Sequence, residues 1–215
     1  MKTLTKEMQA AITPEKALEL LKDGNERFTN NLKVNRNLLQ QANETSDGQH
    51  PFAVILSCID SRTSVELVFD QGLGDVFSVR IAGNIINEDI LGSMEFGCKV
   101  AGAKIIVVLG HTKCGAIKGA CDHLELGNLT ALLSKIQPAV YDEKTVIENR
   151  NSGNDEFVEK VATLNVKRTV HAILERSPIL TEMLETGAIG IVGGNHDLSS
   201  GEVSFYADTL MINKP

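Results

Sequence analysis

Three short apolar runs constrain the fold of this chain more than any other feature of its sequence. They cover residues 52–57, 76–81 and 104–109, and they show little alternation between apolar and polar residues. This pattern is typical of strands that are buried on both faces of a sheet. Helix-like segments at residues 65–69 and 90–100 separate the runs. Strands that alternate with helices predict right-handed crossovers and a mostly parallel sheet that helices cover on both faces.

The flanking segments add helices and an edge hairpin to this sheet. Residues 13–30 predict an amphipathic helix, with Pro14 in a first turn that does not need its missing N–H. The polar residues 35–49 predict a loop or a short helix. Residues 188–192 predict a further strand, and residues 202–206 return beside it as an antiparallel hairpin. More helices are predicted for residues 115–126, 130–136 and 155–175.

Chain length and composition favour a single α/β domain. At 215 residues the chain can bury about 70% of the surface of its unfolded state. No shift in composition marks a boundary, so we expect one domain over residues 1–215. We expect an N-terminal helical arm over residues 1–50. The α/β core then covers residues 51–215, with about four parallel strands, an antiparallel edge strand and flanking helices.

Charge and hydropathy exclude several classes of function. The formal net charge of −7 argues against binding to nucleic acid or to an anionic membrane surface. No window approaches the roughly 18 apolar residues of a membrane helix, and the N-terminus lacks the apolar run of a secretory signal. We therefore expect a cytoplasmic protein. In that setting its four cysteines predict reduced thiols, metal ligands or catalytic groups rather than disulfides.

Two of the predicted strands lead into residues that can bind a metal. Residues 58–62 (CIDSR) follow the first strand, and residues 111–115 (HTKCG) follow the third. Functional groups in parallel sheets collect at the carboxyl ends of strands, where the strand order switches. Cys58, His111 and Cys114 would then supply two thiols and an imidazole, a set that suits zinc. Three protein ligands leave a fourth position for water or substrate, which predicts a catalytic zinc site.

Asp60 and Arg62 flank the first of these ligands. A carboxylate beside a guanidinium stays ionised and is held in one orientation. Asp60 can therefore accept the proton of a zinc-bound hydroxide, or it can occupy the fourth zinc position and close the site. The alternative is an ordinary salt bridge near a helix start, but the position next to Cys58 favours the functional interpretation. Cys98 and Cys121 fall in predicted helices and are expected to be small buried apolar residues.

The chain resembles the beta-class carbonic anhydrases from about residue 13 to residue 206. The motifs that carry the resemblance are 58–62 and 111–115, supported by 25–28 (NERF), 69–75 (FDQGLGD), 79–84 (VRIAGN) and 197–201 (DLSSG). The resemblance implies zinc-dependent, reversible hydration of carbon dioxide to bicarbonate and a proton. It also implies Cys58, His111 and Cys114 as the zinc ligands, with Asp60 and Arg62 as a dyad that orients the hydroxide.

The resemblance further implies an oligomer and a substrate pocket. A homodimer would be the minimal active unit, alone or within a homotetramer, with each site near the subunit interface. Gln49 would reach from the partner chain to the zinc-bound oxygen. Phe77 and Ala82 would form an apolar wall for carbon dioxide, and Gly115 would begin a helix whose amides face the anionic site.

The sequence departs from the family pattern at a second bicarbonate site found in one subgroup. That site uses a Trp, an Arg and a Tyr, and this chain has no Trp. Arg80 matches the Arg, but His196 stands where the Tyr falls, so we expect the regulatory site to be absent. His196 is also a candidate proton shuttle, although a structural role is favoured for it. A structural role is favoured still more strongly for His50, His123 and His171.

The predicted ligands also bear on pH dependence and on alternative functions. Two thiolates place negative charge on the metal and weaken its effect on bound water, so we expect greater activity at alkaline pH. At lower pH, Asp60 could displace the water. Hydrolysis of a sulfur analogue such as carbon disulfide is a second enzymatic hypothesis. A third is non-enzymatic, with the site serving in zinc storage or as a thiol-based redox sensor.

Overall fold

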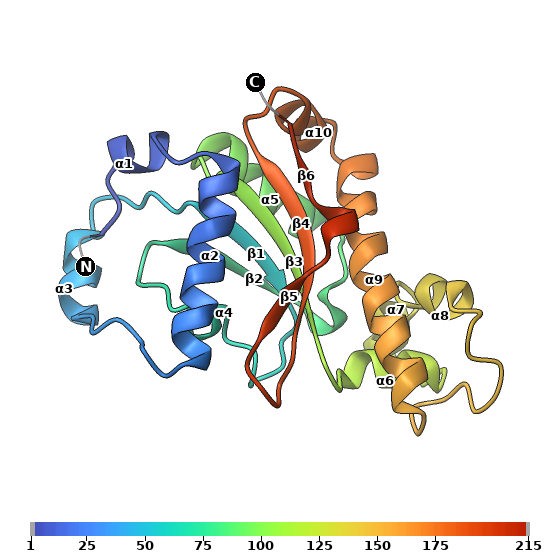
Figure 1. Ribbon diagram of the computed structural model, residues 1–215. Coiled ribbons are helices and arrows are strands. Elements are labelled where there is room, and N and C mark those ends of the chain that lie inside the picture. Colours follow the sequence, from blue (N-terminus) through green and yellow to red (C-terminus); the bar gives the residue numbers. More distant parts are fainter. Residues whose placement is uncertain (1–2, 214–215) are drawn as a thin grey trace.

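The computed structural model describes residues 3–213 and confirms the mixed α/β fold (Figure 1). The strands of its sheet are β1 (Ala53–Ser57), β2 (Val76–Arg80), β3 (Ile105–His111), β4 (Gly190–His196), β5 (Val203–Phe205) and β6 (Met211–Ile212). Strands β1 to β4 are parallel, and β5 and β6 both pair antiparallel with β4. The prediction of about four parallel strands with an antiparallel edge is therefore confirmed.

The strand order places the ends of β1 and β3 side by side. The order is β2-β1-β3-β4-β5, so the chain moves to one side of β1 to form β2 and to the other side to form β3. The order therefore switches between β1 and β3, where Ser57 lies opposite Leu109. Residues that follow these two strands meet at one edge of the sheet, as expected at a topological switch point.

Burial explains why the apolar runs do not alternate. Every residue of β1 and β3 is buried, because these central strands have helices on both faces. Val54 and Leu56 belong to the core on one face, and Ala53 and Ile55 belong to the core on the other. Strand β2 lies at the edge of the sheet and is only partly buried.

The helices of residues 3–213 vary from one turn to six. They are α1 (Lys6–Ala10), α2 (Pro14–Thr29), α3 (Leu38–Glu44), α4 (Val65–Val68), α5 (Glu88–Glu95), α6 (Gly115–Cys121), α7 (Gly127–Leu133), α8 (Gln137–Asp142), α9 (Asp155–Arg176) and α10 (Pro178–Glu185). A π-helical segment, Phe96–Val100, continues α5, and the 3₁₀ turn Ala82–Asn84 follows β2. Thr13 and Asn154 cap α2 and α9, since each side chain accepts a hydrogen bond from a backbone N–H of the first turn.

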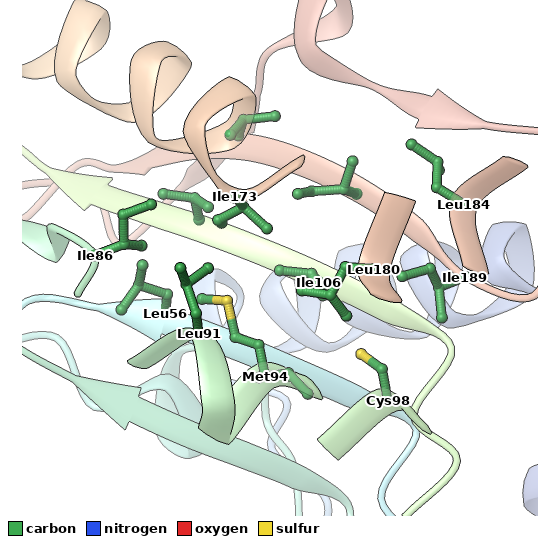
Figure 2. Packing of buried hydrophobic residues seen from close by; sticks show 14 of the residues in the cluster. Leu56, Ile86, Leu91, Met94, Cys98, Ile106, Ile173, Leu180, Leu184 and Ile189 are labelled. Atoms are coloured by element: carbon green, nitrogen blue, oxygen red, sulfur yellow. The ribbon is translucent and has the colours of Figure 1, made fainter. Parts of the chain in front are cut away.

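Different helices cover the two faces of the sheet. The core on one face includes Leu21 of α2 and Phe69, just after α4. On the other face, Leu91 and Met94 of α5 pack in the same cluster as Ile173 of α9 (Figure 2). Helix α9, orange in Figure 1, runs alongside β3 and β4. In residues 3–213, no helix combines the length and the apolar content that crossing a membrane requires.

Several short elements differ from the sequence-based expectation. The helix expected over 115–126 ends at Cys121, because the chain turns at His123, which has a left-handed φ of 51°. The helix expected over 130–136 occupies Gly127–Leu133 instead. Helices α1, α8 and α10 and strand β6 were not predicted. Such short helices depend on tertiary packing, because an isolated helix of this length is unstable in water.

Candidate metal centre

Cys58, His111 and Cys114 lie together at the switch point of the sheet. Their candidate ligand atoms all lie within 4.8 Å of one another. Cys58 directly follows β1, His111 ends β3, and Cys114 is the residue before α6. The Sγ atoms of the two cysteines are 3.9 Å apart, and all three side chains are buried. The topology thus brings together residues that are more than fifty positions apart in the sequence.

The turn between His111 and Cys114 is held from two sides. Lys113 has a φ of 57°, a left-handed conformation that lets the chain pass from β3 to α6 within three residues. Its backbone N–H donates to the Glu159 carboxylate of α9 at 2.8 Å. On the other side, the hydroxyl of Thr112 accepts a hydrogen bond from the N–H of Leu198 at 3.0 Å. The spacing of these two candidate ligands is therefore fixed by α9 and by the segment after β4.

The hydrogen bonding of His111 leaves one ring nitrogen available to a metal. Its Nδ1 lies 2.9 Å from the backbone oxygen of Thr112. A carbonyl only accepts hydrogen bonds, so Nδ1 carries the proton and a neutral ring has its lone pair on Nε2. Nε2 is buried and has no hydrogen-bond partner among residues 3–213. A buried lone pair beside two thiols fits a zinc ion, whose histidine ligands commonly donate the other ring N–H to a carbonyl.

The Cys58 and Cys114 thiols are hydrogen-bonded to one another, and their pKa values shift in opposite directions. The hydrogen bond with Cys114 lowers the pKa of the Cys58 thiol, against the opposing effect of burial. The same contact, together with burial, raises the pKa of the Cys114 thiol. The backbone N–H of Gly83 also donates to Cys58 Sγ at 3.4 Å. A bound divalent cation would favour the deprotonated form of both thiols. Its positive charge would offset the repulsion between two thiolates at this distance.

Asp60 and Arg62 form a paired arrangement beside this cluster. Arg62 donates from Nε to Oδ1 at 2.9 Å and from Nη2 to Oδ2 at 2.7 Å. These hydrogen bonds hold the pKa of Asp60 well below its usual range, although burial opposes them. Oδ2 of Asp60 lies 3.9 Å from Nε2 of His111. Arg80 donates to the backbone oxygens of Cys58 and Asp60, at 3.0 and 2.6 Å, and so holds the loop that carries both residues.

A small, mostly apolar cavity adjoins the cluster. It has a volume of about 260 Å³, and Cys58, Asp60, Ala82 and Gly115 all contribute to its lining. Its apolar wall includes leucines from the region of α6 and α7, namely Leu124, Leu129 and Leu133. Sequence reasoning did not identify these leucines as site residues, because apolar residues at helical spacing also indicate an ordinary core.

Gln49 and Phe77 are not among the residues that line this cavity. Gln49 is exposed in the segment before β1. Phe77 lies on the edge strand β2, where its ring packs edge-on against Phe96 with a centroid distance of 6.3 Å. Both residues line no part of the 260 Å³ cavity. Their predicted roles in the substrate pocket stay predictions.

The remaining cysteines and His196 are buried outside the three-residue cluster. Burial raises the pKa of Cys98 to about 12 and that of Cys121 to about 11, so both thiols stay protonated at neutral pH. His196 is the neighbour of His111 across β3 and β4. Its Nδ1 lies 3.2 Å from the hydroxyl of Thr63, and burial lowers its pKa.

Comparison with known proteins assigns the chain to a family. The family model for carbonic anhydrases matches residues 53–203. The beta-carbonic anhydrase CafA of Aspergillus fumigatus has a similar structure, with a TM-score of 0.69 and 26% sequence identity, covering 94% of this chain and 92% of that one. The chain belongs to the beta-carbonic anhydrase family. The similarity extends well beyond the two motifs, because it covers 94% of this chain.

Other carbonic anhydrases are similar to this one over most of their length. Carbonic anhydrase 2 of Mycobacterium tuberculosis is 35% identical over 202 residues, which cover 87% of this chain and 90% of that protein. Tetrameric beta-carbonic anhydrases from Sordaria macrospora provide a structure with a TM-score of 0.68 and 24% identity. It covers 77% of this chain and 85% of the other.

Proposed function

We propose that this beta-carbonic anhydrase hydrates carbon dioxide reversibly to bicarbonate and a proton at a zinc ion held by Cys58, His111 and Cys114. The observation that carries the proposal is the buried, unpartnered Nε2 of His111 within residues 3–213, grouped with two thiol sulfurs. Zinc bound by three protein ligands retains a position for water and lowers its pKa towards about 7, which supplies a nucleophile near neutral pH.

Asp60 and Arg62 orient the reaction in this proposal. Asp60 is ionised, so it accepts a hydrogen bond from the attacking oxygen and aims a lone pair of that oxygen at carbon dioxide. Arg62 holds both carboxylate oxygens, which fixes the plane of the acceptor. A carboxylate 3.9 Å from Nε2 of His111 is also close enough to support a closed state with Asp60 as the fourth ligand.

The cavity suits a small, non-polar substrate. Its wall is largely aliphatic, and Ala82 and Gly115 leave room because their side chains are small or absent. Carbon dioxide is linear and non-polar, so an apolar wall admits it without any need for hydrogen-bond partners. The charged product is less compatible with this surface, which favours its exchange for water.

We further propose that the active unit is a homodimer, alone or within a tetramer, in which Gln49 and Phe77 serve the site of the partner chain. Neither residue lines the cavity of its own chain, which supports this arrangement. The tetrameric state named for the Sordaria macrospora enzymes is consistent with it.

Metal analysis combined with stopped-flow hydration of carbon dioxide tests the proposed function. We expect one zinc ion per chain and a hydration rate that rises from mildly acidic to alkaline pH, because two thiolate ligands weaken the acidification of water. Carbon disulfide hydrolysis is measured in parallel, since an apolar cavity also admits that molecule. Full zinc occupancy without hydration of carbon dioxide would overturn the proposal, and a flat pH profile would contradict the role of the thiolates.

A further inference from the structure

Asn165 is a polar residue on the buried side of α9. Only 3% of its surface is exposed, and its Nδ2 donates to the backbone oxygen of Gly83 at 2.8 Å. Its buried neighbours on α9 are mostly apolar, among them Val161, Ala162, Val166 and Val170. Burying an amide among apolar groups costs free energy unless the amide is hydrogen-bonded. The contact with Gly83 therefore compensates for placing an amide here.

Gly83 connects Asn165 to a candidate metal ligand. The backbone N–H of Gly83 donates to Cys58 Sγ at 3.4 Å, while its carbonyl oxygen accepts from Asn165. Gly83 has a φ of 68°, in the left-handed region that favours glycine. A Cβ at this position would lie 2.6 Å from Cδ1 of Ile136, so a side chain here would force Ile136 to move. The backbone carbonyl of Gly83 thus binds α9, and its N–H binds the Cys58 sulfur.

We propose that Asn165 is a positioning residue for the metal site, and that it acts through Gly83 to keep an N–H directed at the Cys58 sulfur. This inference rests on the proposed zinc site. A hydrogen bond to a thiolate withdraws negative charge from the sulfur and fixes its orientation, so it alters both the affinity for a metal and the electronic character of the metal–sulfur bond. Without the Asn165 amide, the segment after β2 loses its bond to α9.

Asn25 provides a matched control for this role. It is also buried, with 5% of its surface exposed, and its Nδ2 donates to the backbone oxygens of Val68 and Gly201 at 3.0 and 2.9 Å. These contacts connect α2 to the end of α4 and to the turn before β5, and they involve none of the candidate ligands. Loss of either asparagine amide should reduce stability, but only loss of the Asn165 amide should change metal binding.

The test compares Asn165→Leu with Asn25→Leu in the full chain. Zinc affinity is measured by competition with a chelator, and the thiolate-to-metal absorption is recorded after loading with cobalt(II). We expect the zinc affinity of Asn165→Leu to fall about 10- to 100-fold, the range found when groups behind metal ligands are removed. The cobalt absorption should shift in this variant. Asn25→Leu should lower the melting temperature but keep the affinity and the absorption of the wild type.

The outcomes separate this inference from the proposed function. If Asn165→Leu and Asn25→Leu bind zinc equally tightly and have the same cobalt spectrum, the positioning role is wrong while the zinc site stands. If the wild-type chain itself binds no zinc, both proposals fail. Should Asn165→Leu not fold, Asn165→Ala and Asn25→Ala, which introduce a smaller side chain, are compared by the same two measurements.

Discussion

Arg62 binds both carboxylate oxygens of Asp60, and its own backbone N–H donates to Oδ1 at 3.0 Å. The carboxylate is therefore held by three hydrogen bonds from a single residue two positions along the chain. Because the pair lies beside His111, its orientation relative to the candidate ligands is set by the loop after β1. The Arg62 side chain is exposed, so the three hydrogen bonds, rather than burial, distinguish this pair from a surface pair such as Lys16 and Glu19.

Replacing Asp60 by Asn should remove activity without removing the metal. Asparagine keeps the shape but loses the charge that accepts and orients the attacking oxygen. We expect kcat/KM for carbon dioxide hydration to fall about 100-fold or more, the scale of a lost acid–base group, with zinc content unchanged. Stopped-flow rates and metal analysis check this. Glu156→Gln breaks an exposed pair with Lys160 and serves as the control, because such pairs contribute only about 0–1 kcal/mol. Lower stability with normal turnover in Asp60→Asn would indicate an ordinary salt bridge.

Gly83→Ala should destabilise the protein strongly. The new Cβ would lie 2.6 Å from Cδ1 of Ile136 and 3.3 Å from Cβ of Ala116, and the residue would have to keep a φ of 68°. We expect the free energy of unfolding to fall by about 1–3 kcal/mol, as measured by urea denaturation. At Gly48 an added Cβ meets nothing within 4 Å, so Gly48→Ala is the control and should be neutral. Equal stability of the two variants would contradict this packing.

Asp70→Asn should lower the free energy of unfolding at neutral pH and make it less sensitive to acid. Burial opposes ionisation of Asp70, but hydrogen bonds from Arg27, Arg36 and the N–H of Val34 outweigh it and lower its pKa. A carboxyl whose pKa is lower in the folded state stabilises that state above its unfolded pKa of about 3.9. This contribution is lost as the pH falls further, through the folded pKa.

The measurement for Asp70→Asn is urea denaturation at several pH values. We expect a loss of about 3 kcal/mol at pH 7, as for other broken buried pairs. The difference in the free energy of unfolding between variant and wild type should stay constant down to about pH 5 and shrink below about pH 4. Asparagine also tolerates the left-handed φ of 44° at this position, so backbone strain does not complicate the comparison. An equal difference in the free energy of unfolding at pH 7 and pH 3 would show that Asp70 does not contribute to the acid sensitivity of the protein.

Mixing two inactive variants should restore activity if Gln49 serves the partner chain. Gln49→Ala and Asp60→Asn each damage every site in their own homodimers. In a mixed dimer, the chain with intact Asp60 receives Gln49 from its partner, so one of the two sites is complete. After unfolding and refolding of an equal mixture, we expect about a quarter of the wild-type hydration rate, because half of the dimers are mixed. A rate equal to the mean of the separate variants would show that Gln49 does not act across the interface.

The sheet and the metal-binding motifs were predictable because their signals are local in the sequence. Each apolar run marks a buried strand by itself, and Cys58 and His111 stand directly where two such strands end. The short helices were less predictable, because helices such as α8 and α10 contain few residues and depend on neighbours distant in sequence. Pro178 after Ser177 was a usable signal for the start of α10, since serine caps a helix and proline fits its first turn. The predicted cytoplasmic location stays a prediction.

The sequence by itself determined the fold class, the family and the three residues that could hold a metal, because the order of apolar strands along the chain is sufficient to bring strand ends together at a switch point. Only the tertiary structure decided which groups surround those residues. Asn165 is 82 positions from Gly83, and Glu159 is 46 positions from Lys113. No local pattern relates these pairs, because a hydrogen bond between distant segments depends on how α9 packs against the sheet. The tertiary structure therefore identified the residues that hold the site in place.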